Sequence, residues 1–400
     1  MITQNFIAKI EGHGELIVDF KNERARLAVH EGERLFEGIL VGRTAQEAYW
    51  ITPRICGVCP VAHNLASLAA IENAYGIEVN ETTRLLRLLM KCGQNLQSHI
   101  LHLFFLALPD YLGVDSGFEL EKKNPNVFKN ALILKDIADK IIYTVGGRNV
   151  HPTTTTMGGF NKIPSKNDLQ KLLKFLEKTA KTAKWAAELS RKLEYPALNT
   201  DLELVAKKND KIISNKNETI SVKNYKENIS EEVKNYSTAK FGKFNNREIM
   251  VGALARIALS KNSKKIAKKY GLNFNNPFHN IPAQLIEILK YHNLAVKITK
   301  KLLIIEMNSE IIKPSLNPLL EGIGAIEAPR GGLYHEIHLN EKGVITYANI
   351  ITPTVQNLSS IEKSANDLLC QTKNKTEEER KKLLIMLIRA YDPCLSCSTH

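Results

Sequence analysis

The sequence predicts a mainly α-helical protein with peripheral β structure (α+β), built around a core bundle of long helices. Segments with apolar residues at helical spacing recur through most of the chain. Alternating apolar and polar residues, which indicate strands, are confined to short stretches near the start, the middle and the last fifth. Because no repeat or linker divides the chain, we expect one domain over residues 1–400. It would carry an N-terminal β region at about 5–31 and a small β-rich insertion at about 200–245.

The N-terminal β region is predicted from apolar residues at every second position. Leu16 and Val18 share one face, and Ala25, Leu27 and Val29 repeat the spacing after a polar turn. In the insertion, apolar pairs on either side of the turn-like stretch 214–217 predict a hairpin. A further pair of strands is predicted at 333–338 and 343–351.

Helices make up most of the other predicted elements. The first covers 62–75 and ends at Gly76, because glycine readily adopts the left-handed conformation of a helix C-cap. The longest covers 82–108 and is expected to stop at Pro109. Further helices are predicted at 128–145, 167–194, 246–260, 283–312 and 360–389, the last with a charged run at 373–382 that is either its solvated face or an interrupting turn.

Composition narrows the class of protein. The 400 residues carry a formal net charge of +13, and a strongly positive charge is typical of proteins that bind nucleic acid. The lysines are scattered, often beside asparagine, and form no stripe with interleaved aromatic residues, so we expect no nucleic-acid partner. No apolar run approaches the roughly 20 residues that span a bilayer, and the first residues form no signal peptide. We therefore expect a cytoplasmic protein, associated with membranes only through partners.

Two Cys-x-x-Cys pairs carry the chemistry, and they lie almost as far apart as the chain allows. Cys56 and Cys59 form the first pair, and Cys394 and Cys397 form the second. Each pair is followed by a histidine within four residues. The i, i+3 spacing lets both sulfurs of a pair face one ion, and thiolates favour soft or borderline metals. The two other cysteines, Cys92 and Cys370, are expected to be buried apolar filler.

The thiols alone leave several interpretations open. Nickel or iron suits four thiolates, and a structural four-cysteine zinc site suits them as well. A redox-active dithiol is disfavoured because no βαβ pattern surrounds either pair. Structural disulfides are disfavoured because the chain shows no secretory signal.

Beyond the cysteines, the chain resembles the large, catalytic subunit of nickel–iron hydrogenases over essentially its whole length. Both Cys motifs look like those of that family, most of all those of its cytoplasmic multisubunit branch. Other stretches resemble it in the same chain order: Ile10-Glu11-Gly12-His13, Phe36-Glu37, Ser98-His99-Ile100-Leu101-His102, Gly146-Gly147-Arg148, Ser237-Thr238-Ala239-Lys240 and Glu327-Ala328-Pro329-Arg330-Gly331. The resemblance implies the long-helix core of such large subunits, together with reversible heterolytic cleavage of dihydrogen to protons and electrons.

The resemblance also implies a cofactor and its ligands. Cys56 and Cys394 would be terminal ligands of nickel. Cys59 and Cys397 would bridge nickel to an iron that also carries carbon monoxide and two cyanides. A zinc site would explain the thiols but not the other matching stretches.

The remaining implied roles fall to side chains near that centre. Glu11 would carry protons away, and Arg330 would lie over the cyanides. Thr354 would donate a hydrogen bond to a cyanide, although the sequence after Pro353 departs from the family pattern. His63 would hydrogen-bond the bridging sulfur of Cys59.

A magnesium site is implied as well. Glu37, the backbone carbonyl of Ile350 and His400 match its ligands, and oxygen donors suit that hard cation. His99 and His102 stay unassigned between packing and function. In the family a C-terminal extension is removed after nickel insertion, which leaves such a histidine last. The sequence is consistent with that mature form, and equally with a gene that lacks the extension.

Partners follow from the cysteine count. Four of six cysteines belong to the centre, so the chain has too few left for an iron–sulfur cluster, and electrons would leave through an iron–sulfur small subunit. Further partners would be flavin/NAD(P)-, deazaflavin- or disulfide-reductase-linked subunits, a maturation protease and nickel-insertion proteins. A hydrogen-sensing relative is the alternative function. A relative of the quinone-site subunit of respiratory complex I is excluded because those proteins have lost the four cysteines.

Overall fold

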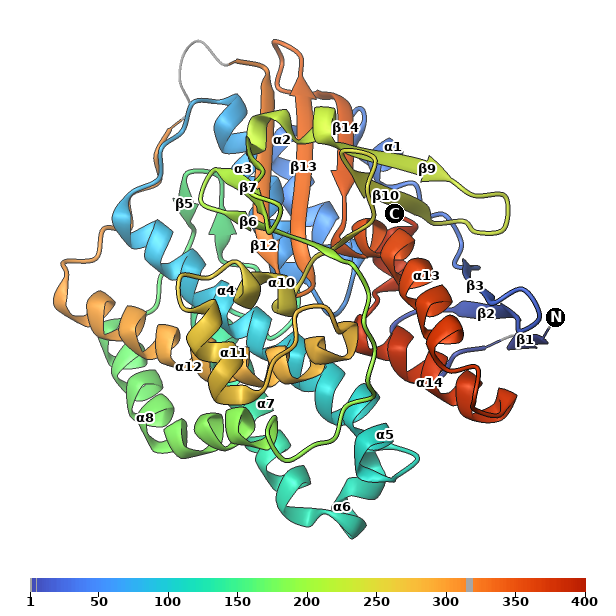
Figure 1. Cartoon of the computed structure of the whole chain (residues 1–400). Coiled ribbons are helices and arrows are strands. Elements are labelled where there is room, and N and C mark those ends of the chain that lie inside the picture. Colours follow the sequence, from blue (N-terminus) through green and yellow to red (C-terminus); the bar gives the residue numbers. More distant parts are fainter. Residues whose placement is uncertain (1, 5, 314–318) are drawn as a thin grey trace.

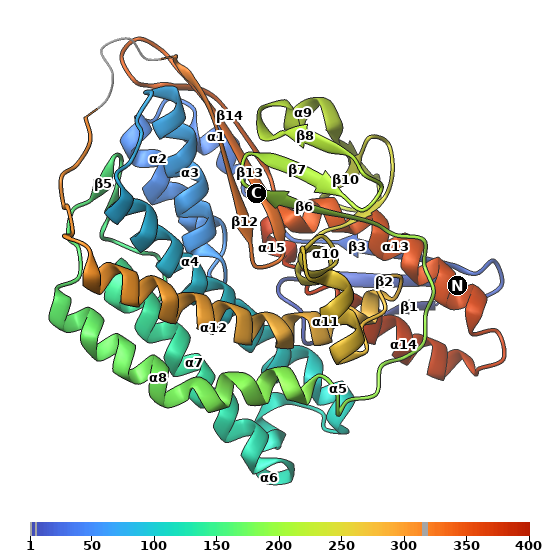
Figure 2. The same ribbon diagram turned by 60° about the vertical axis from the view of Figure 1, so that its left-hand side comes forward.

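Long helices packed side by side form the core of the protein, as the computed structural model in Figure 1 shows; it describes residues 2–4, 6–313 and 319–400. Helix α4 (Glu81–Leu101) contacts both α7 (Pro125–Gly146) and α12 (Asn280–Ile304). Helix α8 (Lys166–Leu189) packs on α7 and along α12 (Figure 2). The predicted mainly α fold with a long-helix core and peripheral sheets is confirmed.

The remaining helices surround this bundle, and two of them begin directly after a cysteine. Helix α3 (Pro60–Ala74) starts with a proline, whose missing N–H is tolerated in a first helical turn, and α15 (Leu395–Ser398) starts directly after Cys394. No helix in the described part of the chain has the length and apolar character needed to cross a membrane. The other helices are α1 (Phe36–Leu40), α2 (Ala45–Ile51), α5 (Leu108–Leu112), α6 (Leu120–Lys123), α9 (Tyr225–Asn228), α10 (Ala253–Ala258), α11 (Ser263–Tyr270), α13 (Pro353–Gln371) and α14 (Glu377–Ala390).

The strands form small sheets at the edge of the bundle. The order β1-β2-β3 joins Ile2–Gln4, Gly14–Asp19 and Arg24–Val29. The order β11-β6-β7-β8 joins Ile249–Met250, Glu203–Lys208, Lys211–Ser214 and Thr219–Ser221, and β9 (Ile229–Val233) pairs with β10 (Lys240–Phe244). The order β12-β13-β14 joins Glu321–Ala328, Gly331–Leu339 and Ile345–Ile351, and β4 (Thr155–Thr156) pairs with β5 (Gly159–Phe160).

Helix α3 and the sheet β12-β13-β14 are in direct backbone contact. A Cβ added to Gly322 would lie 1.9 Å from the carbonyl oxygen of Ala70, and one added to Gly324 would lie 2.0 Å from that of Ala66. Only glycine leaves room for this approach. Because α3 begins immediately after Cys59, the contact fixes the helix that presents the first cysteine pair.

The prediction that the longest helix stops at Pro109 was wrong. After α4 the chain continues through a π-helical segment, His102–Ala107, into α5. Pro109 lies in the first turn of α5, where a missing N–H is tolerated. A wide π turn is a common place for such a change of helix register.

Two other predicted elements need correction, and one strand was missed. Within 246–260 the structure has strand β11 and the short α10, because Gly252 at φ 117° separates them. The helix predicted at 360–389 is two helices, and the interrupting turn is the correct interpretation of the charged run: Thr376 and Glu379 form a capping box that starts α14. Strand β12 was missed because its two glycines and its charged ends hide the apolar alternation.

The two single cysteines differ from each other. Cys92 is buried inside the bundle, as predicted. Cys370 is exposed, so the prediction of buried filler was wrong there. It lies in the last turn of α13, on the face that no neighbouring element covers.

Candidate metal centre

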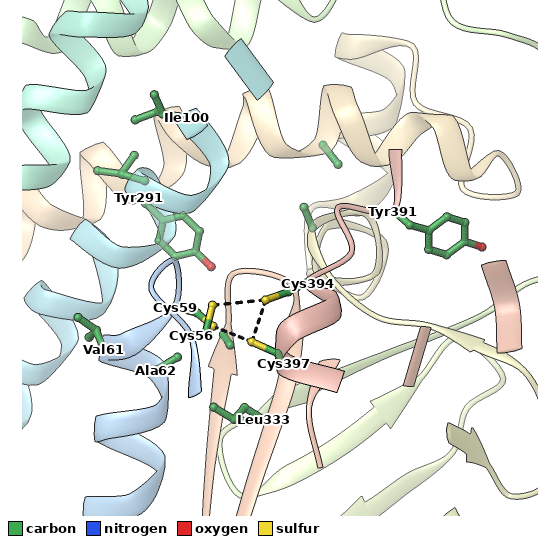
Figure 3. Packing of buried hydrophobic residues seen from close by; sticks show 14 of the residues in the cluster. Cys56, Cys59, Val61, Ala62, Ile100, Tyr291, Leu333, Tyr391, Cys394 and Cys397 are labelled. Atoms are coloured by element: carbon green, nitrogen blue, oxygen red, sulfur yellow. Dashed lines mark hydrogen bonds between the residues drawn. The ribbon is translucent and has the colours of Figure 1, made fainter. Parts of the chain in front are cut away.

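The turn that carries the second cysteine pair is held against the N-terminal part of the chain. Residues Glu11 and Cys394 form a parallel β-bridge, and the Leu395 N–H donates to the Glu11 carbonyl at 2.9 Å. Cys59 occupies the N-cap position of α3, and Cys394 occupies that of α15. Figure 3 shows the four sulfurs facing one another, two from the loop before α3 and two from the last turn of the chain.

The sulfur atoms form a compact cluster. The Sγ atoms of Cys56 and Cys394 are 3.4 Å apart, as are those of Cys59 and Cys397. The Cys394 and Cys397 sulfurs are 2.8 Å apart. All four lie within 4.8 Å of one another, which is the spacing of ligands that share metal ions. The structure thus brings together all four predicted cysteines.

The cluster lies in a dry environment that favours metal binding over free thiols. The four cysteines are buried. Hydrogen bonds from the neighbouring thiols lower the pKa of Cys56 well below its ordinary value. Burial raises the pKa of Cys394 and Cys397, because a thiolate without a counter-charge is poorly solvated there. A bound cation would supply the missing counter-charge.

Arg330 lies against the cluster with one half of its guanidinium paired and the other half free. Its Nε donates to the Asp392 backbone oxygen at 2.8 Å and to the Asp392 carboxylate at 2.9 Å. Its Nη1 is buried and has no hydrogen-bond partner among the described residues. Burial would lower the pKa of Arg330, but the Asp392 carboxylate and the nearby cysteines raise it well above its ordinary value. A permanent cation with a spare N–H therefore faces the sulfurs.

A small cavity separates Arg330 from the thiols. It has a volume of about 10 Å³, which is roughly the room for one water. Thr354 also lines it, and its hydroxyl accepts the Cys394 N–H at 2.9 Å, which leaves the hydroxyl hydrogen free to donate. The lining residues are Cys59, His63, Ala328, Pro329, Arg330, Leu333, Pro353, Thr354, Cys394 and Cys397.

His63 contacts a different sulfur from the one expected. Its Nε2 lies 3.9 Å from the Sγ of Cys397, while the predicted partner was Cys59. Cys59 is the N-cap residue of α3 and has non-helical φ and ψ, and both it and His63 line the cavity. The other ring nitrogen of His63 lies 3.2 Å from Nε2 of His335. Burial lowers the pKa of His63 to about 3 and that of His335 well below its ordinary value, so both rings are neutral.

Glu11 lies beside the second cysteine pair, outside the thiol cluster itself. Its carboxylate accepts the N–H of Ser396 at 3.2 Å, and it is half-buried. Gly12 follows at φ 87°, and a Cβ there would lie 2.8 Å from that of Leu395, so the turn needs glycine. This contact holds the carboxylate between the thiol-bearing turn and the surface.

The three residues expected to bind magnesium come together at a separate place. The Glu37 carboxylate accepts the Ile350 N–H at 2.7 Å and lies 3.7 Å from Nε2 of His400. Nε2 of His400 lies 2.6 Å from the Ile350 carbonyl oxygen. Although burial pushes the pKa of Glu37 upward, the His400 ring and the Ile350 N–H hold it below its ordinary value.

The ring of His400 is in an unusual hydrogen-bonding position. Its Nδ1 faces the Cys397 carbonyl at 2.7 Å, and its Nε2 faces the Ile350 carbonyl. A neutral imidazole can donate from only one nitrogen. One of the two carbonyls therefore needs a cation or a second ring proton between it and the imidazole.

Sequence reasoning missed a buried ionic network behind Arg330. Arg256 donates to the backbone oxygens of Ala328 and Pro329 at 3.0 and 2.7 Å. It also pairs with Glu287 at 2.6 Å and with Glu327 at 2.9 Å. The network fixes the two residues that precede Arg330. An arginine in the otherwise apolar stretch 249–259 was the available signal for it.

The two unassigned histidines of the long helix belong to this framework and not to the thiol cluster. His99 contacts Glu287 at 3.1 Å. His102 contacts the Gln284 side chain at 2.6 Å and the Arg389 backbone oxygen at 2.7 Å. Both are buried between α4 and α12.

The fold and the site together define a class. A mainly helical chain that buries four clustered thiols, from two distant parts of its sequence, beside an arginine has the donor set of a soft-metal site. The comparison with known proteins makes the family explicit. The family model for nickel-dependent hydrogenases matches residues 34–133 and 205–400.

Whole-chain relatives agree with that match. The chain is 34% identical to the alpha chain of sulfhydrogenase 1 of Pyrococcus furiosus, over 100% of this chain and 97% of that one. It is 32% identical to the alpha chain of sulfhydrogenase 2 of the same organism, over 98% and 97%. The structure of an NAD+-reducing [NiFe]-hydrogenase in the H2-reduced state superposes with a TM-score of 0.85 at 25% identity, covering 100% and 99%. The chain therefore belongs to the nickel-dependent hydrogenases, as the catalytic large subunit of a nickel–iron hydrogenase, an oxidoreductase that acts on hydrogen.

Proposed function

We propose that the four thiols hold nickel and an iron that carries carbon monoxide and two cyanides, and that this centre cleaves dihydrogen reversibly. The observation that carries the proposal is the free, buried Nη1 of Arg330 beside four clustered sulfurs. A structural zinc site would need no such donor, whereas small anionic ligands on iron would accept from it. The four thiols and the free N–H of Arg330 therefore suit a nickel–iron centre with small anionic ligands.

The resemblance assigns separate roles to the cysteines. Cys56 and Cys394, whose sulfurs are in contact, would be the terminal ligands of nickel. Cys59 and Cys397 are also in contact and would be shared with iron; both line the cavity under Arg330, as Cys394 does. When bound, the centre would supply the polarisation that splits dihydrogen into two protons and two electrons.

The surrounding side chains would orient the diatomic ligands and move protons. Arg330 and the free hydroxyl hydrogen of Thr354 both face the cavity and would donate to cyanides there. The neutral His63 ring would donate to a sulfur, which the contact with Cys397 favours over Cys59. Glu11 is the carboxylate next to the second cysteine pair and would accept the proton that leaves it.

A magnesium ion would complete the region around the chain end. Glu37, the Ile350 carbonyl and His400 offer two oxygens and one nitrogen. A cation at Nε2 would resolve the conflict of an imidazole placed between two carbonyls and would leave Nδ1–H to bond the Cys397 oxygen. Through that bond the ion would steady the turn that carries Cys397.

Electrons would leave through a partner chain. The relatives are named as single subunits of sulfhydrogenase, F420-non-reducing and NAD-reducing hydrogenases, so each works within an assembly. The thiols outside the cluster are the buried Cys92 and the exposed Cys370, too few to hold an iron–sulfur cluster. We expect the immediate acceptor to be an iron–sulfur small subunit, with flavin/NAD(P)-, deazaflavin- or disulfide-reductase-linked subunits beyond it.

Metal analysis with infrared spectroscopy tests the proposal. The purified complex should contain nickel and iron, with bands from bound carbon monoxide and cyanide. Cys397→Ser should lose those bands, whereas Cys370→Ser, which changes an exposed thiol far along α13, should keep them. Zinc in place of nickel, together with a spectrum that lacks the diatomic bands, would contradict the proposal.

A further inference from the structure

A second cavity, apart from the metal centre, opens between the helix bundle and the hairpin β6-β7. It is bounded by α4, α10 and α12 and has a volume of about 440 Å³, within the range of small-molecule sites. It shares no lining residue with the cavity at the thiols. Its six cationic lining residues are Lys91, Lys207, Lys208, Arg256, Lys261 and Lys290, and its one carboxylate is Glu327.

The carboxylates near the cavity do not neutralise it. Glu327 is already bound by Arg256, and its other oxygen accepts the backbone N–H of Lys207 at 2.8 Å. The buried Glu287 is shared between Arg256 and Lys290. The ammonium groups of Lys91 and Lys207 have no hydrogen bond or ion pair with any described residue.

Lys91 is the most informative of these side chains. It projects from the middle of α4 to the cavity wall and is half-buried there; burial disfavours its charge, Glu327 favours it, and the nearby cations Lys207 and Arg256 oppose it. The pKa of Lys91 is accordingly lowered to about 8, with burial as the first cause, and burial lowers the pKa of Lys207 as well. A half-buried ammonium group without a bonded counter-charge is partly desolvated, and an anion bound in the cavity would stabilise it.

The rest of the wall is apolar. Ala206 and Ile213 come from the hairpin, Leu259 follows α10, and Tyr291 and Leu294 lie on α12. Such a wall suits an aromatic or aliphatic group larger than an inorganic ion. Lysine binds phosphate as a point charge, and two unpaired ammonium groups match the two charges of a phosphate ester better than the single charge of a carboxylate.

We propose that this cavity binds a small organic phosphate, with its phosphate between Lys91 and Lys207 and its apolar part on the wall from Ile213 to Leu294. The site does not depend on the metals at the thiols. Its link to the centre is Glu327, which lies three residues before Arg330 and contacts both Arg256 and Lys207.

Calorimetric titration of the purified complex with phenyl phosphate tests the proposal. In about 0.15 M salt, where surface charges are largely screened, we expect saturable binding with one molecule bound per large subunit. Binding should be tighter than that of inorganic phosphate and absent for phenol. Lys91→Met should weaken it at least tenfold, whereas Lys264→Met, an exposed lysine on α11, should leave it unchanged.

A second readout separates binding from folding. Without ligand, Lys91→Met should unfold at the same temperature as the wild type or higher, because it replaces an unpartnered cation with an apolar chain of similar length. Phenyl phosphate should raise the unfolding temperature of the wild type but not of this variant. If Lys91→Met fails to fold, Lys207→Met replaces it in both measurements and should also weaken the binding of phenyl phosphate. Unsaturable binding, or equal losses in the Lys91 and Lys264 variants, would overturn the site; binding only to an acidic peptide would assign the surface to a protein partner instead.

Discussion

At the scale of single residues, the guanidinium of Arg330 has two roles: one edge anchors the side chain, and the other offers a hydrogen-bond donor at the metal centre. One edge of its guanidinium is held by Asp392, which is itself two residues before Cys394. The Nη1 of the other edge is buried and has no hydrogen-bond partner in the described part of the chain, and Arg330 lines the cavity. Because the ion pair fixes the position of the free N–H, Asp392 sets where that donor points without touching the cavity.

Glu11 gives the prediction at this scale. Glu11→Gln keeps an acceptor for the Ser396 N–H but removes the group that can take up a proton. The centre should assemble with unchanged infrared bands, while hydrogen–deuterium exchange with solvent should fall by about 100-fold or more. Glu15→Gln, on the neighbouring strand β2, is the control and should exchange normally. Normal exchange in Glu11→Gln would remove this carboxylate from the proton route.

Residue types predicted the thiols but not all of their neighbours. Two cysteines at i and i+3 indicate a metal site whatever fold the rest of the chain adopts. The sulfur nearest His63 comes from Cys397, 334 positions away in the chain, and no spacing rule encodes that contact. Asp392 went unnoticed because its role needs a partner 62 positions away.

At the scale of elements, the centre depends on the contact between α3 and the sheet β12-β13-β14. The sheet approaches the helix so closely that Gly322 and Gly324 face its backbone carbonyls. A displacement of α3 would move Cys59 at its N-terminus, and strand β12 of the same sheet ends at Ala328, two residues before Arg330. Thiols and arginine are therefore positioned by one packing interface.

Substitution of Gly324 tests this interface. Gly324→Ala would place a Cβ 2.0 Å from the Ala66 oxygen, so the sheet must shift. We expect a loss of at least about 1–3 kcal/mol in the free energy of unfolding, with reduced nickel content. Gly38→Ala in α1 meets open space at ordinary φ and should be neutral or slightly stabilising. Equal unfolding temperatures for the two variants, measured by circular dichroism, would show that the close approach does not matter.

Elements with steady helical spacing were predicted well, and those shaped by tertiary contacts were not. The bundle helices follow the apolar period directly. Strand β12 carries its glycines for the sake of α3, so its own pattern is weak. The helical path continues past Pro109 because a π-helical segment precedes it, and local sequence patterns do not predict π turns.

At the scale of the whole molecule, one buried ionic network joins the bundle to the sheet. His99 of α4, Arg256 of α10, Glu287 of α12 and Glu327 of β12 are linked to one another. Arg256 also bonds the Ala328 oxygen. A buried network holds its members in one arrangement, so it relates the long helices to the loop of Arg330.

Removal of Glu287 should therefore be costly and dependent on pH. Glu287→Gln leaves Arg256 without its main counter-charge and should cost about 3–5 kcal/mol at pH 7. Burial would raise the pKa of Glu287, but Arg256 and Lys290 hold it well below its ordinary value. The carboxylate therefore stabilises the fold above its unfolded pKa of about 4.3, and that stabilisation is lost as the pH falls through the folded pKa.

Thermal unfolding from pH 7 down to pH 3 measures this. The gap between the wild type and Glu287→Gln should be constant near neutrality and should narrow below about pH 4. Glu177→Gln removes an exposed ion pair with Lys300 and should change stability by less than about 1 kcal/mol. A gap that widens in acid would contradict the sign of this argument.

The meeting of Glu37, Ile350 and His400 could not be read from their spacing in the sequence. The three residues come from α1, β14 and the turn after α15, and only the folded chain brings them within bonding range. The resemblance supplied them as a set, and the structure supplies the distances.

The pairing of the first cysteine motif with the second also affects when the thiol cluster can form during synthesis of the chain. The close sulfur pairs join residues 338 positions apart. At ribosomal rates of about 5–20 residues per second, the second pair is made roughly 20–70 s after the first. Throughout that interval a nascent chain offers Cys56 and Cys59 alone. The complete ligand set therefore exists only once the second pair has been made, and a metal that needs all four thiols cannot be held before then.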